Sequence, residues 1–153
     1  MNFLNVHIGR KRLQKKKCKC VPDTNFEKVK EFHEIFRCTI GNFDCPGFTN
    51  ESDRGTRLRL IKEEYDELAE AIEENHDNKE IAKELVDLLY VVYGTGIAMG
   101  IDLDEAFDLV HNSNMSKLDD DGEPIFNNYG KVMKSVNYRP PNLQEIANGS
   151  KKA

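Results

Sequence analysis

The sequence contains no tryptophan, and no apolar run in it is long enough to cross a membrane as a helix. Such a helix needs about 20 apolar residues, and the nearest stretch, residues 81–99, is broken by Lys83, Glu84 and Asp87. No secretory signal with an apolar core is visible either. The chain has 153 residues, 39% of them hydrophobic and 32% charged, so we expect one domain with a modest core and no membrane partner.

Acidic residues are absent from residues 1–22, which contain seven lysines and arginines. The remainder therefore carries 15 basic residues against 27 acidic ones, a formal charge of −12. An acidic body repels phosphate backbones, which argues against nucleic acid as the main partner. We interpret residues 1–22 as a disordered basic extension. A nuclear-import or polyanion-binding patch and a mitochondrial leader are the alternative interpretations. We therefore expect a cytoplasmic protein, and the basic extension leaves a nuclear or mitochondrial location open.

Cysteine is scarce, and the four residues of this type lack the paired C-x2-C spacing of most zinc sites. They are Cys18, Cys20, Cys38 and Cys45. Without an export signal, we expect reduced thiols and no structural zinc.

The hydrophobic periodicity predicts an all-α fold, an antiparallel helical bundle of four main helices. The expected helices cover residues 24–37, 56–75, 79–99 and 102–114. A long loop at 38–55 separates the first two, and long loops in small domains are often functional. After residue 117 we expect a small hairpin-like extension and a helical turn at 142–147. The domain should span residues 23–147, with 148–153 as a tail.

Two apolar stripes are expected to face the core. In the first helix the stripe is Phe26, Val29, Phe32, Ile35 and Phe36. In the second it is Leu58, Ile61, Tyr65, Leu68 and Ile72. The helices have more apolar surface than four elements bury alone, so a homodimer or homotetramer is expected.

Two acidic pairs lie on helices. Glu64 and Glu67 are at the edge of the second helix's buried face, whereas Glu84 and Asp87 are surrounded by apolar residues. Buried carboxylates are costly unless a positive charge compensates them. Lys62 and Lys83 are near in sequence but are expected on other faces. A hard divalent cation, Mg²⁺ or Mn²⁺ in its place, fits oxygen ligands.

For the remaining acids of the second helix, a solvated surface is the alternative interpretation. They are Glu63, Asp66, Glu70 and Glu73.

The pattern E-E-x-x-E at Glu63, Glu64 and Glu67, followed by E-x-x-D at Glu84 and Asp87, resembles a known signature. It is that of the MazG-like all-α nucleoside triphosphate pyrophosphohydrolases, which include dimeric dUTPases, dCTP pyrophosphatases and phosphoribosyl-ATP pyrophosphohydrolases. The similarity continues through "NFEKVKEFHEIF", "ELVDLLYVVYGTGIAMGIDLDEAF", "HNSNMSK" and "DGEPIFNNYGKVMK", from about residue 25 to residue 143.

The resemblance implies that both acidic pairs hold Mg²⁺ on a nucleoside triphosphate. The ligands would be Glu64, Glu67, Glu84 and Asp87. Glu63 would position or deprotonate the attacking water, which overrides the solvated-surface interpretation for this residue. The products would be a nucleoside monophosphate and pyrophosphate. A deoxy or non-standard substrate such as dUTP or dCTP is expected, in housecleaning of the nucleotide pool.

Four further residues are candidates for phosphate binding: Asn114, Lys117, Lys131 and Lys134. Surface charges are the alternative for the lysines, and a helix C-cap is the alternative for Asn114. His33 is a candidate for contact with the base, because related dCTP-hydrolysing enzymes use a histidine of the first helix. A core histidine is its alternative, and the loop at 38–55 is expected to vary the pocket.

Two rival functions remain. One is a non-catalytic helical module that binds metal or docks a partner. The other is hydrolysis of phosphoribosyl-ATP.

Overall fold

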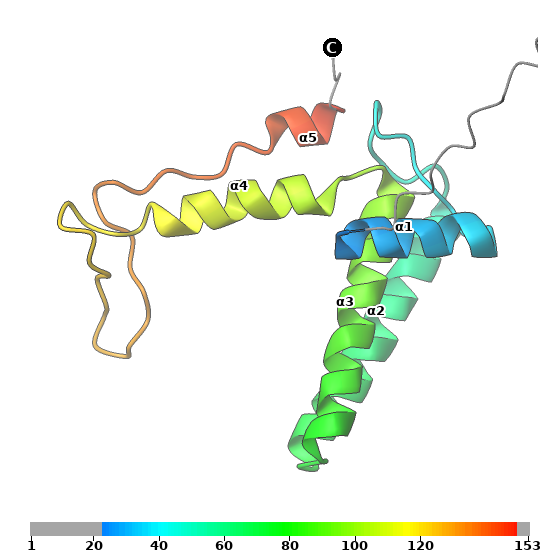
Figure 1. Ribbon diagram of the computed structural model, residues 1–153, viewed down its shortest axis with the longest axis horizontal. Helices are drawn as coiled ribbons and strands as arrows, with labels where there is room; N and C mark the ends of the chain where they lie inside the picture. The colour runs from blue at the N-terminus through cyan, green and yellow to red at the C-terminus, as the bar shows by residue number, and fades with distance from the viewer. Residues whose placement is uncertain (1–22, 150–153) are drawn as a thin grey trace, which may run out of the picture.

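The structure, a computed structural model, describes residues 23–149, and the regular elements in that range are helices (Figure 1). Its helices are α1 (Asn25–Phe36), α2 (Glu51–Glu73), α3 (Asn78–Met99), α4 (Leu103–Met115) and the short α5 (Gln144–Asn148). The all-α prediction is confirmed. Our predictions for the basic extension, Cys18, Cys20 and the end of the tail concern residues outside the described range.

The first helix begins as its sequence predicts. The Thr24 side chain accepts a hydrogen bond from the Glu27 amide, and the Glu27 carboxylate accepts from the Thr24 amide, which satisfies two free N–H groups of the first turn. The helix ends at Arg37, whose φ of 58° lies in the left-handed region.

The start of α2 is five residues earlier than the sequence predicted. Asn50 caps the helix by accepting from the Asp53 amide at 2.8 Å, and its own amide donates to the Asp53 carboxylate at 2.9 Å. This cap and the acidic first turn outweigh the cost of Gly55 inside the helix, which is about 1 kcal/mol. The loop is therefore shorter than expected, residues 37–50.

Helices α2 and α3 lie side by side and α1 crosses them near the carboxyl end of α3 (Figure 1). The core sits at this crossing, where Phe26 and Val29 of α1 pack against Ile97 of α3. Phe43 of the loop closes it, with its ring 6.0 Å from that of Phe26 and nearly perpendicular to it.

Helix α4 turns away from α3 by 110° rather than packing back along the α2–α3 pair (Figure 1). An antiparallel bridge between Phe126 and Val132 confirms the expected hairpin-like extension beyond α4. The chain then returns beside α4, where the Ser113 hydroxyl donates to the Arg139 carbonyl at 2.7 Å. Among the described helices none could cross a membrane alone; α3 and α4 reach the required length and apolarity only as a sharply bent pair.

Much of the predicted core is exposed in the single chain. On α1, Phe26 and Val29 are buried as expected, but Ile35 and Phe36 are more than 60% exposed. On α2 the expected stripe is only partly covered: Ile61 and Leu68 are half-buried, but Leu58, Tyr65 and Ile72 are exposed. The covered face of α2 is shifted toward Leu60, Glu64 and the buried Ala71. The line through Leu58, Tyr65 and Ile72 is thus left uncovered in the single chain.

The loop at 37–50 is fixed against the carboxyl end of α3. The Gly41 amide donates to the Ile97 carbonyl at 2.8 Å, and the Gly47 amide donates to the Met99 carbonyl at 2.7 Å. A Cβ atom on Gly41 would stand 2.4 Å from the Gly100 nitrogen and 2.6 Å from the Ala98 oxygen. Only glycine fits at position 41, because the obstructing atoms are backbone.

We expect Gly41→Ala to lower the free energy of unfolding by about 2 kcal/mol, since the loop must move off α3. Gly55→Ala is the matched control: nothing lies within 4 Å of its Cβ position, and the substitution should stabilise α2 by about 1 kcal/mol. Urea denaturation followed by circular dichroism measures both. Equal effects of the two substitutions would contradict the described loop contact.

Candidate functional site

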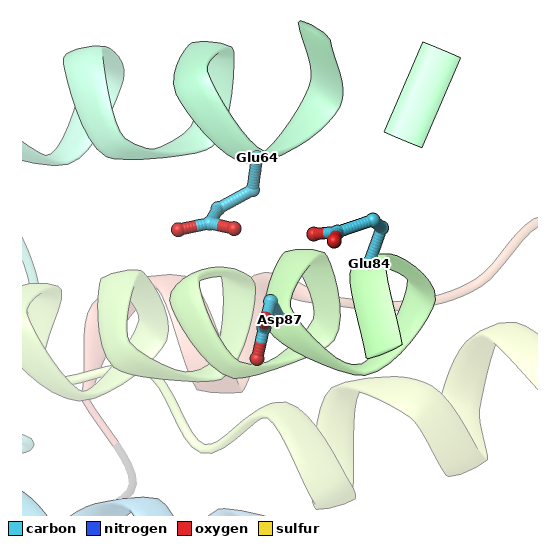
Figure 2. A group of neighbouring side chains, drawn as sticks. All are labelled: Glu64, Glu84 and Asp87. Carbon is cyan, nitrogen blue, oxygen red and sulfur yellow. The ribbon is translucent and has the colours of Figure 1, made fainter. Parts of the chain in front are cut away.

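Three carboxylates meet in the space between α2 and α3. One oxygen each of Glu64, Glu84 and Asp87 lies within 4.8 Å of the others. Figure 2 shows Glu64 reaching down from α2 and Glu84 reaching up from α3, with their carboxylates facing each other. These are three of the four predicted metal ligands, and they come from the two separate sequence motifs.

The cluster is electrostatically strained. Burial raises the pKa of the Glu64 carboxyl above its ordinary value, and the negative charges of Glu67 and Asp87 raise it further. The Glu84 side chain is 15% exposed and that of Asp87 is 39% exposed, so solvent screens the repulsion only in part. The arrangement therefore favours a cation.

Lys83 supplies such a cation, and our prediction that it lies on another face is wrong. Its Nζ is 3.1 Å from Glu84 Oε1 and 2.8 Å from Asp87 Oδ2. These hydrogen bonds raise the pKa of the ammonium group. Residues four apart on a helix share a face, so the spacing of Lys83 and Asp87 carried this signal.

The donor set suits a hard divalent ion. Carboxylate oxygens from two helices are the ligands that Mg²⁺ and Mn²⁺ prefer. Glu67 is exposed and stands outside the group of three, although its charge reaches Glu64. Glu63 is also exposed, and its carboxylate lies 3.6 Å from Arg59 Nη1. The roles of these two residues stay predictions.

A cavity of about 460 Å³ opens beside the acids, lined by parts of α1, α2, α3 and the loop. Leu60 and Val91 form one edge, and each lies four residues from a carboxylate, Glu64 or Asp87. Four residues of helix rise about 6 Å, so the cavity and the acids share one groove between α2 and α3. From the loop, Cys38 and Thr39 reach the cavity lining, whereas Phe43 belongs to the core.

His33 lines this cavity and is also buried, with 3% of its surface exposed. Its Nδ1 donates to the Thr39 carbonyl at 2.8 Å, because a carbonyl only accepts hydrogen bonds. Burial lowers the pKa of His33, the hydrogen bond to the Thr39 carbonyl opposes this, and the positive charge of Arg57 lowers the pKa further, so the environment favours the neutral ring. Nε2 is then a hydrogen-bond acceptor.

Sequence reasoning missed Arg57, which lines the same cavity. It lies on the α2 line that continues through Leu60 and Glu64, so it faces α3. The sequence carried little signal for it, because the cavity around Arg57 is formed by residues of α1 and α3, far away in the sequence.

Of the four candidate phosphate-binding residues, Asn114 and Lys117 lie far from the acids of the same chain, while the roles of Lys131 and Lys134 stay predictions. Lys117 donates to Asn114 at 2.8 Å at the far end of α4, and Lys134 lies over the Tyr138 ring at 4.1 Å. From Asp87 to the end of α3, and again along α4, the chain rises about 20 Å. With a turn of 110° between these helices, Lys117 and Asp87 are on the order of 20 Å apart.

We expect Lys83→Met to tighten Mn²⁺ binding by about two- to fivefold, because it removes an ammonium group that competes for Glu84 and Asp87. Lys62→Met is the control, since Lys62 is an exposed lysine of the neighbouring helix. Titration of Mn²⁺ followed by electron paramagnetic resonance measures both. An affinity that is unchanged or weaker in Lys83→Met would contradict the competition.

Comparison with known proteins agrees with this geometry. The family model for phosphoribosyl-ATP pyrophosphohydrolase matches residues 29–114, which is 86 of the 153 residues and includes all three clustered acids. The chain is also 36% identical over 115 residues to uncharacterized protein L479 of Acanthamoeba polyphaga mimivirus. That match takes in 74% of this chain and 43% of the viral protein, so the chain spans less than half of that relative's length. The chain thus belongs to the phosphoribosyl-ATP pyrophosphohydrolase family, within the MazG-like all-α nucleoside triphosphate pyrophosphohydrolase superfamily.

Proposed function

We propose that this protein is a Mg²⁺-dependent nucleoside triphosphate pyrophosphohydrolase. The observation that carries the proposal is the group of three carboxylates, with oxygens within 4.8 Å of one another, in one groove with a cavity of about 460 Å³. A triphosphate and this acidic cluster repel each other, so the pair requires cations between them. A deoxy-pyrimidine or non-standard triphosphate such as dUTP or dCTP is the substrate that we propose.

The acids have separable roles in this reaction. Glu64, Glu84 and Asp87, with Glu67 beside them, would hold the metal and thereby fix the triphosphate in the groove. When bound, Mg²⁺ would neutralise charge on the phosphate oxygens and lower the pKa of water. Glu63 would accept a proton from the water whose oxygen attacks the α-phosphorus. The bond from the α-phosphorus to the oxygen bridging to the β-phosphate breaks, and the products are a nucleoside monophosphate and pyrophosphate.

We also propose that the active form is a homodimer or homotetramer in which subunits share a site. The exposed stripe of α2 and the outward turn of α4 support this, because apolar helix faces of this kind are covered in stable proteins. Lys117 and Asn114 would then meet the acids of a second subunit rather than those of their own chain.

The function is tested with Glu64→Gln and Asp87→Asn. Each should lower kcat at least about 100-fold because it removes a metal ligand, while the circular dichroism spectrum stays unchanged. Glu70→Gln, on the exposed face of α2, is the control and should keep wild-type kcat. Chromatography identifies the products from a panel of standard and damaged triphosphates with Mg²⁺ or Mn²⁺.

Monophosphate plus pyrophosphate supports the proposal, whereas diphosphate plus orthophosphate contradicts it. The panel includes phosphoribosyl-ATP, which the family match favours as a second candidate substrate. Turnover of that compound alone would replace the deoxynucleotide assignment. Absence of turnover on every compound would support the non-catalytic module instead.

Subunit sharing is tested by mixing Asp87→Asn with Lys117→Ala, each inactive alone, after dissociation and re-pairing. A shared site predicts recovery of about a quarter of the wild-type activity in a dimer. Half of the randomly paired dimers are mixed, and each mixed dimer contains one intact site. No recovery above the separate variants, despite pairing shown by light scattering, would contradict the shared site.

A further inference from the structure

Arg57 is a cation without an assigned role. The α2 helix contains three arginines, of which Arg54 pairs with Glu51 and Arg59 lies near Glu63. The Arg57 side chain forms no ion pair or hydrogen bond with any other residue in the range 23–149, although it is partly buried in the cavity lining. Among the described residues no buried side-chain nitrogen or oxygen lacks a hydrogen-bond partner, so the unpaired guanidinium of Arg57 is open to the cavity and its donors can reach a ligand there.

The acid best placed to neutralise Arg57 is already engaged. Asp53 lies one turn earlier on α2, but one of its oxygens accepts from the Thr39 hydroxyl and the other accepts from Thr49 and Asn50. These bonds cap α2 and tie the loop to it. The guanidinium donors of Arg57 therefore stay available to the cavity.

Gly94 of α3 brings Arg57 and His33 together. A Cβ atom at position 94 would stand 3.0 Å from Arg57 Nη1 and 3.0 Å from His33 Nε2. The two nitrogens are consequently no more than 6.0 Å apart. In the neutral ring, with Nδ1 donating to Thr39, the Nε2 nitrogen beside Arg57 is an acceptor. The cavity thus presents a fork of donors beside one acceptor.

We propose that Arg57 is a specificity-determining residue that reads, together with His33, the hydrogen-bonding edge of a cytosine base. This inference rests on the proposed function, because it assumes that the cytosine belongs to a nucleoside triphosphate substrate. Arg57 would donate to the ring nitrogen and carbonyl of cytosine, two adjacent acceptors, while His33 Nε2 accepts from the exocyclic amino group. Uracil has an N–H between its two carbonyls, where cytosine has an acceptor nitrogen. The two donors of the Arg57 guanidinium would therefore meet only one acceptor on uracil instead of two adjacent ones.

The surroundings favour a base over a phosphate at this position. A phosphate offers acceptors alone at neutral pH, and the lone pair of His33 Nε2 would oppose it. Phe32 and Tyr90 line the same cavity, with rings 5.5 Å apart and perpendicular, and give a base apolar faces to pack against. The acids lie one helical turn beyond Leu60 and Val91, where the phosphates would follow.

The first test uses nucleosides, which have no phosphate, in the presence of EDTA. Calorimetry should show that deoxycytidine binds the wild type about tenfold more tightly than deoxyuridine. Arg57→Gln and Arg57→Lys should both lose this preference, because neither keeps the fork. Arg54→Gln is the matched control and should retain it. The melting temperature of Arg57→Gln should equal that of the wild type, since Arg57 has no partner to lose.

The second test separates this inference from the proposed function. With Mg²⁺ and triphosphates, Arg57→Gln should raise KM for dCTP about tenfold with kcat nearly unchanged, and should change KM for dUTP little. An equal rise of KM for dCTP and dUTP, or equal binding of the two nucleosides to the wild type, would show that Arg57 does not recognise the base. Turnover of the triphosphates would still support the proposed function in that case. If the wild type hydrolyses nothing, the proposed function fails, and nucleoside binding alone decides the role of Arg57.

Discussion

Mutual repulsion among Glu64, Glu84 and Asp87 is the constraint on which the rest of the structure depends. The helix pair α2–α3 holds Glu64 and Glu84 face to face with Asp87 close by (Figure 2), and burial and the neighbouring negative charges both make ionised Glu64 costly. Lys83 offsets part of that cost, but it is an exposed side chain that can swing away. Under the proposed function, a divalent cation that arrives with the triphosphate would offset the rest of that cost.

The groove between α2 and α3 sets the order in which the parts of a bound nucleotide would lie along it. The acids lie along the α2–α3 pair, and the cavity follows one turn nearer to α1. Phosphates and base would therefore occupy successive turns of the same two helices, with α1 and the loop closing the end that takes the base. The rigid contact of Gly41 with α3 matters here because it fixes Thr39, and Thr39 orients the His33 ring. Helix packing, loop anchoring and ligand recognition are thus one continuous set of contacts.

Local signals in the sequence predicted most of the helices, because caps such as Thr24 and Asp102 act within a few residues. Spacing marked the two acidic pairs as candidates, and the resemblance to the pyrophosphohydrolases joined them into one site, of which the structure brings Glu64, Glu84 and Asp87 together. The prediction for α2 was wrong in two respects. The cap at Asn50 was overlooked, and the apolar stripe through Leu58 was assigned to the core. Periodicity locates an apolar face but does not say whether the same chain or a second copy covers it. Arg57 was missed for a related reason, since its environment is created by α1 and α3, far away in sequence.

The most direct measurement is the anomalous diffraction of a crystal grown with Mn²⁺. The account predicts a peak between α2 and α3, within bonding distance of the Glu64, Glu84 and Asp87 oxygens, with Lys83 displaced from the cluster. A crystal in which Mn²⁺ binds elsewhere, or in which Lys83 still pairs with Glu84 and Asp87 at saturating Mn²⁺, would contradict it.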